Sequence, residues 1–151
     1  MALRVMIVDD EIELVGALVE RLEIRGIDAT ATRVRQGFEI VEGRMFQWGL
    51  NEVVVGIGAR GEFEGLELGD VIEVARENWP VVGIFDAGGS AFDSEIWTDY
   101  TVLAQAYKRS DNVFQSITTR LASPAAFSAF KDALTSDPRL TVQVERENEY
   151  Y

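Results

Sequence analysis

The residue pattern that most directly suggests chemistry is a glycine motif in the middle of the chain. Residues 56–61 read GIGARG, the GxGxxG spacing, and Asp86 follows 30 residues after Gly56. In a dinucleotide-binding site such glycines let the backbone approach a pyrophosphate at a helix N-terminus, and the acid holds a ribose hydroxyl. That arrangement needs a helix after the motif, which Gly65 and Gly69 would interrupt. We therefore expect no cofactor site here, and a dinucleotide-binding enzyme is kept as an alternative.

Two adjacent acids, Asp9 and Asp10, follow a short apolar run near the N-terminus. The run, Leu3 to Val8, predicts a buried strand, and acids suit the positive end of a helix that begins after it. Hard carboxylate oxygens are also the ligands that magnesium prefers. We expect Asp9 and Asp10 to cap a helix, with a magnesium site as the alternative.

A third group of acids, Asp93, Glu95 and Asp99, surrounds Trp97. If this segment is a strand, alternation places these residues on one face, where the acids could gather a cation. A single strand offers too few converging oxygens for that role. We expect instead a solvated sheet edge whose charges discourage pairing with other edges.

Composition removes most enzyme classes. The 151 residues contain no cysteine and no histidine, which excludes thiol chemistry, thiolate metal sites and the commonest general base. The net charge of −12 disfavours binding to nucleic acid and to anionic membrane surfaces. We expect no catalytic residue, no cofactor and no enzymatic activity. Because no apolar run is long enough to cross a bilayer, and acids stand where a signal peptide would be apolar, we expect the given chain to be soluble without a signal peptide.

The two ends of the chain carry similar patterns. Helical spacing of apolar residues predicts a helix from Ile12 to Ile24, with Gly26 as its C-cap, and then a strand from Ile27 to Arg33. Near the C-terminus we expect a strand from Val113 to Ala122. A helix then starts at Ser123 and Pro124 and carries Phe127, Phe130 and Leu134 on one face. A final strand runs from Leu140 to Arg146.

The middle of the chain has a different texture. Residues 37–111 contain eleven of the 13 glycines, and residues 34–112 carry 14 acidic against 6 basic residues. Short Val-rich runs separated by turns predict β-structure with one helix: strands near Glu52 to Val55, Asp70 to Ala75 and Val81 to Asp86, and a helix near Tyr100 to Arg109.

These elements predict an α+β fold. We expect a single domain of residues 1–151, in which residues 1–35 and 113–151 form a ferredoxin-like, or porter-like, pair of split βαβ units. Residues 36–112 then form a β-rich inserted subdomain.

The N-terminal segment VMIVDDE, with the helix and strand expected after it, resembles the opening of a response-regulator receiver domain over residues 3–33. By that resemblance Asp9 and Asp10 would hold magnesium beside a phosphorylated aspartate. The stretch LNEVVV at residues 50–55, where the acceptor aspartate would stand, contains none. A receiver-like signalling domain is therefore the alternative function.

Residues 34–151 resemble the periplasmic core domain of MacB-type, FtsX-related ABC-transporter permeases. The resemblance rests on six stretches in matching order: VEGRMF, LNEVVVG, FEGLELGD, WPVVGIFDAGGSAFDSEIWTD, RLASPAAF and DPRLTVQVERENEYY. It implies a non-catalytic domain outside the cytoplasmic membrane, between two transmembrane helices that this sequence does not include. The implied role is to relay motion or to contact other transporter components, a partner or a cargo. Residues 1–33 are then either a fused or chimeric unit or a divergent part of the same domain.

Overall fold

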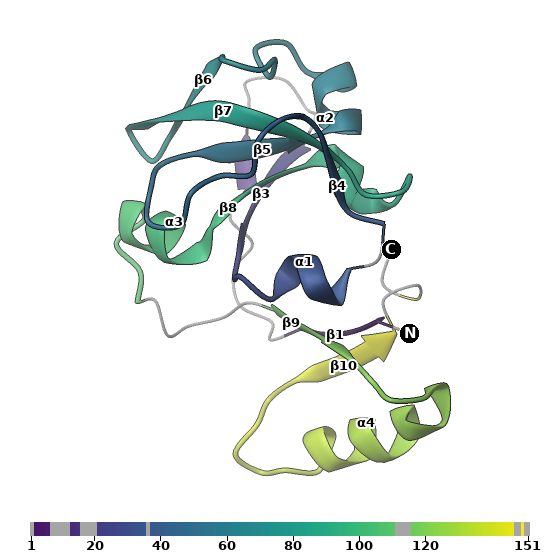
Figure 1. Ribbon diagram of the computed structural model, residues 1–151. Coiled ribbons are helices and arrows are strands. Elements are labelled where there is room, and N and C mark those ends of the chain that lie inside the picture. The colour runs from purple at the N-terminus through teal and green to yellow at the C-terminus, as the bar shows by residue number, and fades with distance from the viewer. Residues whose placement is uncertain are drawn as a thin grey trace. The chain divides into compact units, whose positions relative to one another are not determined.

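The computed structural model describes residues 2–6, 13–15, 21–35, 37–110, 116–146 and 149, and it has an α+β fold. The chain forms two compact units (Figure 1). Unit 1 contains residues 1–11, 33–35 and 113–151, and unit 2 contains residues 12–32 and 36–112. Residues 12–32, which we assigned to the first βαβ half, thus lie in the same unit as the middle of the chain. That residues 1–151 fold as one domain stays a prediction.

Unit 1 is built on a three-stranded antiparallel sheet. Strand β1 (Ala2–Met6) lies between β9 (Ser116–Arg120) and β10 (Gln143–Arg146). A short 3-10 turn, Pro124–Ala126, leads into helix α4 (Phe127–Thr135). The core contains Phe127 and Val144, packed against partly buried Leu121, Phe130, Leu134 and Val142. The predicted strand, helix and strand at the C-terminal end are confirmed, although the Ser123 side chain makes no capping hydrogen bond.

Unit 2 is built on a mixed sheet in the order β2-β3-β8-β5-β7-β4, and β6 also pairs with β7. The strands are β2 (Glu13–Val15), β3 (Arg21–Ile27), β4 (Glu39–Gly43), β5 (Val53–Gly56), β6 (Val71–Val74), β7 (Glu77–Asp86) and β8 (Glu95–Asp99). The helices are α1 (Ala31–Val34), whose last two residues are assigned to unit 1, α2 (Ile57–Glu62) and α3 (Tyr100–Ala106). The strands predicted in the middle of the chain and the helix near Tyr100 are confirmed.

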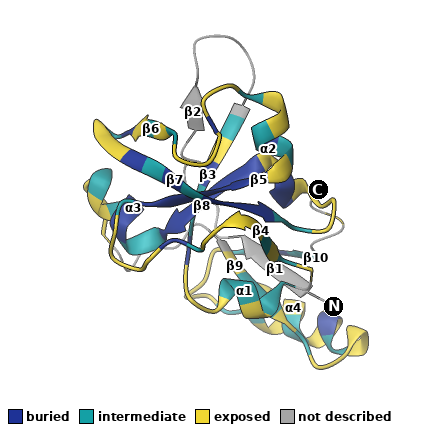
Figure 2. Cartoon of the chain, turned by 45° about the horizontal axis from the view of Figure 1, so that its top comes forward, coloured by how far each residue is buried: buried dark blue, intermediate teal, exposed yellow. Residues whose placement is uncertain are grey.

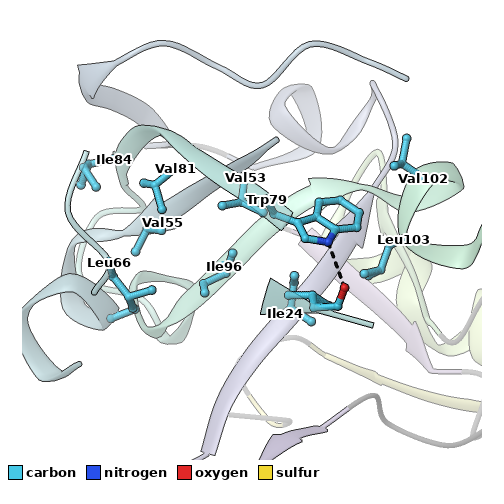
Figure 3. Close-up of a cluster of buried hydrophobic side chains, with 12 residues drawn as sticks. Ile24, Val53, Val55, Leu66, Trp79, Val81, Ile84, Ile96, Val102 and Leu103 are labelled. Atoms are coloured by element: carbon cyan, nitrogen blue, oxygen red, sulfur yellow. Dashed lines mark hydrogen bonds between the residues drawn. The ribbon is translucent and has the colours of Figure 1, made fainter. Parts of the chain in front are cut away.

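The core of unit 2 has two clusters of buried side chains. One contains Trp79, whose indole N–H donates to the carbonyl of Val74 at 3.1 Å, among valines, isoleucines and leucines (Figure 3). The other is aromatic: Phe38 stacks on Trp97 with ring centroids 5.2 Å apart, and Phe85 lies 4.6 Å from the same ring. Strands β5 and β8 are buried along their whole length (Figure 2). They are the fixed frame for the surrounding loops.

An irregularity in β7 divides its side chains between the two clusters. Val53 pairs with Val81, but Val54 pairs with Gly83, so that Val82 is an extra residue on β7. As a result Val81 and Ile84 both join the Trp79 cluster although they are three residues apart. A regular alternation would have placed them on opposite faces.

The predicted helix from Ile12 to Ile24 is wrong. Residues 13–15 and 21–27 form strands β2 and β3, and β3 pairs in parallel with β8. Leu22 and Ile24 pack in the Trp79 cluster, whereas Ile27 packs in the aromatic cluster, which is the alternation of a strand buried on both faces. The predicted C-cap Gly26 lies inside β3, where a Cβ would be 2.6 Å from the Cα of Tyr100.

The predicted strand from Ile27 to Arg33 is also wrong. Strand β3 ends at Ile27, and Asp28 then accepts hydrogen bonds from the backbone and hydroxyl of Thr30 before α1 begins at Ala31. This turn ends the strand because a short acidic side chain binds the backbone two residues ahead.

Among the residues that the structure describes, no helix has the length and apolar character required to span a membrane.

Candidate functional site

The glycine motif is a place of close packing between backbones. Strand β5 ends at Gly56, and α2 begins at Ile57, so the helix contains Gly58 and Gly61 and ends at Glu62. A Cβ on Gly56 would lie 2.2 Å from the carbonyl oxygen of Asp93, and one on Gly58 would lie 2.9 Å from it. The first two glycines therefore let the short 3-10 helix Ala91–Ser94 approach the end of β5. Helix α2 itself was not predicted, but it ends one residue after Gly61, as expected from Gly65 and Gly69, and the first two glycines of the motif have a structural role.

The acids around Trp97 do not form a solvated edge, which corrects our prediction. Strand β8 lies inside the sheet between β3 and β5, and the exposed fraction of Glu95 is only 3%. The guanidinium of Arg25 on β3 donates two hydrogen bonds to Glu95, at 2.8 and 2.7 Å, and the indole N–H of Trp97 donates a third at 2.7 Å. The carboxylate is buried because three donors replace its water.

The two other acids bind backbone N–H groups of loops. Asp93 accepts hydrogen bonds from Ala87 at 2.6 Å and Gly89 at 2.8 Å, and so closes the turn after β7. Asp99 caps α3 through the N–H and hydroxyl of Thr101, and its second oxygen accepts from the N–H of Gly49 at 2.7 Å. A buried carboxylate with such donors holds loop backbone in place.

Each of the three acids thus has its own set of hydrogen-bond donors. Within the described ranges, no three Asp or Glu residues are grouped so that they could hold a metal ion. Asp9 and Asp10, the alternative magnesium ligands, lie outside the described residues.

The loop between β4 and β5 presents two exposed apolar side chains on a fixed backbone. Trp48 is 45% exposed and Leu50 46% exposed, whereas Phe46, which meets the Trp48 ring edge-on at 4.8 Å, is buried. We name residues 44–52 the Trp48 loop. Asp99 holds it in the middle through Gly49, whose φ of 85° suits glycine.

Glu52 fixes both ends of the Trp48 loop. Its carboxylate accepts two hydrogen bonds from the guanidinium of Arg44, at 2.8 and 2.6 Å, and one from the N–H of Gln47 at 2.8 Å. The hydroxyl of Thr98 on β8 donates to the carbonyl of Glu52 at 2.7 Å. The Trp48 loop was not among the sites predicted from the sequence. The signal that could have found it is a tryptophan and a leucine on either side of a glycine in a turn.

The stability of the protein should depend on the ionisation of Glu52. The hydrogen bond from Arg44 holds the pKa of Glu52 below its ordinary value of 4.5, against an opposing effect of burial. A carboxyl whose pKa is lowered by folding stabilises the folded state above its unfolded pKa and loses that contribution as pH falls through the folded pKa. We expect Glu52→Gln to lower the free energy of unfolding at pH 7 by about 1.5 to 3 kcal/mol, the range for hydrogen bonds to charged groups.

Urea unfolding between pH 7 and pH 3 checks this prediction. The free energies of unfolding of wild type and Glu52→Gln should converge as pH falls below 4.5. Glu73→Gln removes the same charge from an exposed strand position and is the control, with little expected change at pH 7. A difference in free energy of unfolding that stays constant from pH 7 to pH 3 would contradict the role of the carboxylate.

Comparisons with known proteins agree on one fold. The model of the MacB-like periplasmic core domain family matches residues 4–137. The structure is similar to the periplasmic region of MacB from Actinobacillus actinomycetemcomitans, with a TM-score of 0.60 and 16% identity over 97% of this chain and 72% of that one. It is also similar to the extracellular domain of the noncanonic ABC-type transporter YknZ from Gram-positive bacteria, with a TM-score of 0.57 and 13% identity over 97% and 77% of the two chains.

A domain of a putative permease protein from Porphyromonas gingivalis is a third similar structure, with a TM-score of 0.52 and 13% identity over 96% of this chain and 70% of that one. At these identities the structural likeness shows the fold alone. No curated protein matches the chain significantly. The family match starts at residue 4, so it includes the segment in which we saw a receiver-like opening and ends before the last 14 residues. A fused or substituted first unit is not needed to explain that segment.

Proposed function

The chain belongs to the MacB-like periplasmic core domain family, and on that premise we propose that it is a non-catalytic contact module of an ABC-transporter permease. Domains of this family are extracytoplasmic parts of transporters. In the proposed role, this domain contacts another transporter component or a cargo outside the membrane and relays motion to or from it.

The observation that carries the proposal is the Trp48 loop. Exposed aromatic side chains on a fixed backbone are well suited to protein contacts, because little conformational entropy is lost when a partner covers them. Trp48 and Leu50 are almost half exposed, and the backbone between them is bound by Asp99. The loop can therefore be bound without first being ordered.

The attachment of the loop supports the relay part of the proposal. Gly49 is bonded to Asp99 at the end of β8, and Asp99 is also the N-cap of α3. Glu52 is bonded to Thr98 on the same strand. A displacement of the loop would thus act directly on the central strand and on the start of a helix.

A photo-reactive amino acid in place of Trp48, in the protein in its native cells, tests the contact. We expect a cross-link to another transporter component or to a transported molecule, identified by mass spectrometry. The same group in place of Arg139, an exposed residue of unit 1, is the control and should give no such product. Equal products at both positions, or none at position 48, would overturn the proposed contact.

The relay role has a separate test in the assembled transporter. Trp48→Ala combined with Leu50→Ala should leave the domain folded and the transporter assembled, with a thermal midpoint lowered only modestly by the loss of the contact with Phe46, but should reduce transport per ATP hydrolysed. Unchanged coupling in a stable double variant would contradict the relay role.

A further inference from the structure

A second surface of unit 2, the sheet edge formed by β4 and β6, has the features of a strand-binding edge. Strands β4 and β6 both pair with β7, and in the described part of the chain neither has another partner. Adjacent carbonyls of β7, those of Val82 and Val81, accept hydrogen bonds from Arg44 and Gly69. Successive carbonyls of a regular strand point to opposite sides, but the extra residue Val82 brings these two to the same side. The segment before β6 therefore continues along the side of β7 on which β4 lies. A Cβ at Gly43 would be 2.6 Å from a methyl carbon of Leu68, which confirms that the two segments meet.

The backbone of β6 leaves donors and acceptors directed outward. The carbonyl of Asp70 accepts from the N–H of Val81, and pairs alternate along an antiparallel ladder. Ile72 and Val74 therefore direct their backbone groups toward β7, whereas Val71 and Glu73 direct theirs away from it. Val71 lies opposite Pro80, which has no N–H to donate, in agreement with this alternation.

Apolar side chains accompany this free edge. Val71 is 58% exposed, the highest value among the large apolar residues that the structure describes, and Leu68 is 46% exposed. On the β4 side the apolar surface continues with Val41, at the irregular position of that strand. A sheet edge with open backbone groups and exposed apolar side chains is a place where an extended chain can add as a further strand.

The charges along the edge determine what kind of strand fits. Three exposed acids, Glu39, Glu67 and Glu73, accompany it, and a second copy of this chain would bring the same acids against them. A fourth acid, Glu42, is paired with Arg60 at 2.5 Å. Like charges opposite one another in adjacent strands are destabilising, and opposite charges are favourable. The complementary partner is therefore basic.

We propose that the outer edge of β6, from Leu68 to Glu73, binds an extended segment of another protein in which apolar and basic side chains alternate. Backbone hydrogen bonds to Val71 and Glu73 supply the attachment, contacts with Leu68 and Val71 supply the apolar part, and the acids select lysine or arginine. The inference rests on the proposed contact role, and it adds a second surface with a defined partner chemistry.

A labelled eight-residue peptide of alternating valine and lysine, with blocked ends, is the probe, and fluorescence anisotropy with the full chain is the measurement. We expect saturable binding that weakens as salt is raised. Leu68→Ser with Val71→Ser should reduce the affinity about tenfold or more. Ile117→Ser with Leu140→Ser, which removes two other exposed apolar groups from unit 1, should leave it unchanged.

Val71→Pro separates strand addition from side-chain contact. It removes the outward N–H at the first residue of β6, a position where proline is tolerated, and should weaken binding while the thermal midpoint stays close to that of wild type. A peptide in which glutamate replaces lysine should not bind.

Three results would overturn the inference. They are equal binding by both serine pairs, full binding by a folded Val71→Pro variant, and a dimer of the chain that the changes at Leu68 and Val71 dissociate. The test is separable from that of the proposed function, because peptide binding in solution can fail while cross-linking at position 48 succeeds, and the reverse.

Discussion

Replacing Gly56 by alanine is expected to destabilise unit 2 by more than about 3 kcal/mol or to remove its cooperative unfolding transition. The added Cβ would lie 2.2 Å from the carbonyl oxygen and 2.6 Å from the carbonyl carbon of Asp93, closer than any real contact. Both atoms are backbone, and Asp93 is itself fixed by hydrogen bonds to Ala87 and Gly89, so neither side can move away at low cost. Overpacking of a buried site normally costs about 1 to 3 kcal/mol, and a clash between two backbones should exceed this range.

Urea unfolding followed by tryptophan fluorescence measures the effect, and the same motif supplies the controls. Gly61→Ala, in the last turn of α2, places a Cβ where nothing lies within 4 Å, and should be neutral or stabilising by about 0.5 to 1 kcal/mol. Gly58→Ala, with a contact of 2.9 Å to Asp93, should be intermediate. If Gly61→Ala were the most damaging of the three, the packing role of the motif would be refuted.

Replacing Arg25 by methionine is expected to lower the free energy of unfolding by about 3 to 5 kcal/mol. Methionine keeps most of the apolar volume but removes two charge-assisted hydrogen bonds, at 2.8 and 2.7 Å, from Glu95. Glu95 is then a carboxylate with 3% exposure whose remaining donor in this group is the Trp97 indole. Breaking a buried ion pair from one side is costly because the other charge stays buried without compensation.

Urea unfolding at pH 7 of a mutant cycle identifies the source of that loss. Arg25→Met combined with Glu95→Gln removes the uncompensated charge and should be more stable than Arg25→Met alone. Glu23→Gln is the control, because Glu23 binds the same guanidinium at 2.7 Å but is half exposed, and its loss should cost less than about 1 kcal/mol. A double variant no more stable than Arg25→Met would show that lost packing, and not the charge, causes the effect.

The two classes of error in the sequence predictions have related causes. Leu22 and Ile24 fit both a helical stripe and a strand buried on both faces, and the parallel pairing of β3 with β8 selects the strand. The acids at Asp93, Glu95 and Asp99 indicated an exposed edge, since carboxylates are seldom buried. Their partners, Arg25 and Gly49, are 70 and 50 residues away in sequence from Glu95 and Asp99 and could not be paired with them by spacing.

The α+β class, the central strands, the C-terminal strand-helix-strand order and the resemblance to MacB-like domains could all be predicted from the sequence. These features depend on local patterns, such as short valine runs, turn glycines and a helix start at Ser123 and Pro124, which act over a few residues. Three features could be established only from the folded chain: β3 is a strand, the glycine motif packs against Asp93, and buried acids hold the Trp48 loop. Each of these depends on contacts between residues far apart in the chain, where the gain from burial and pairing outweighs the local preference.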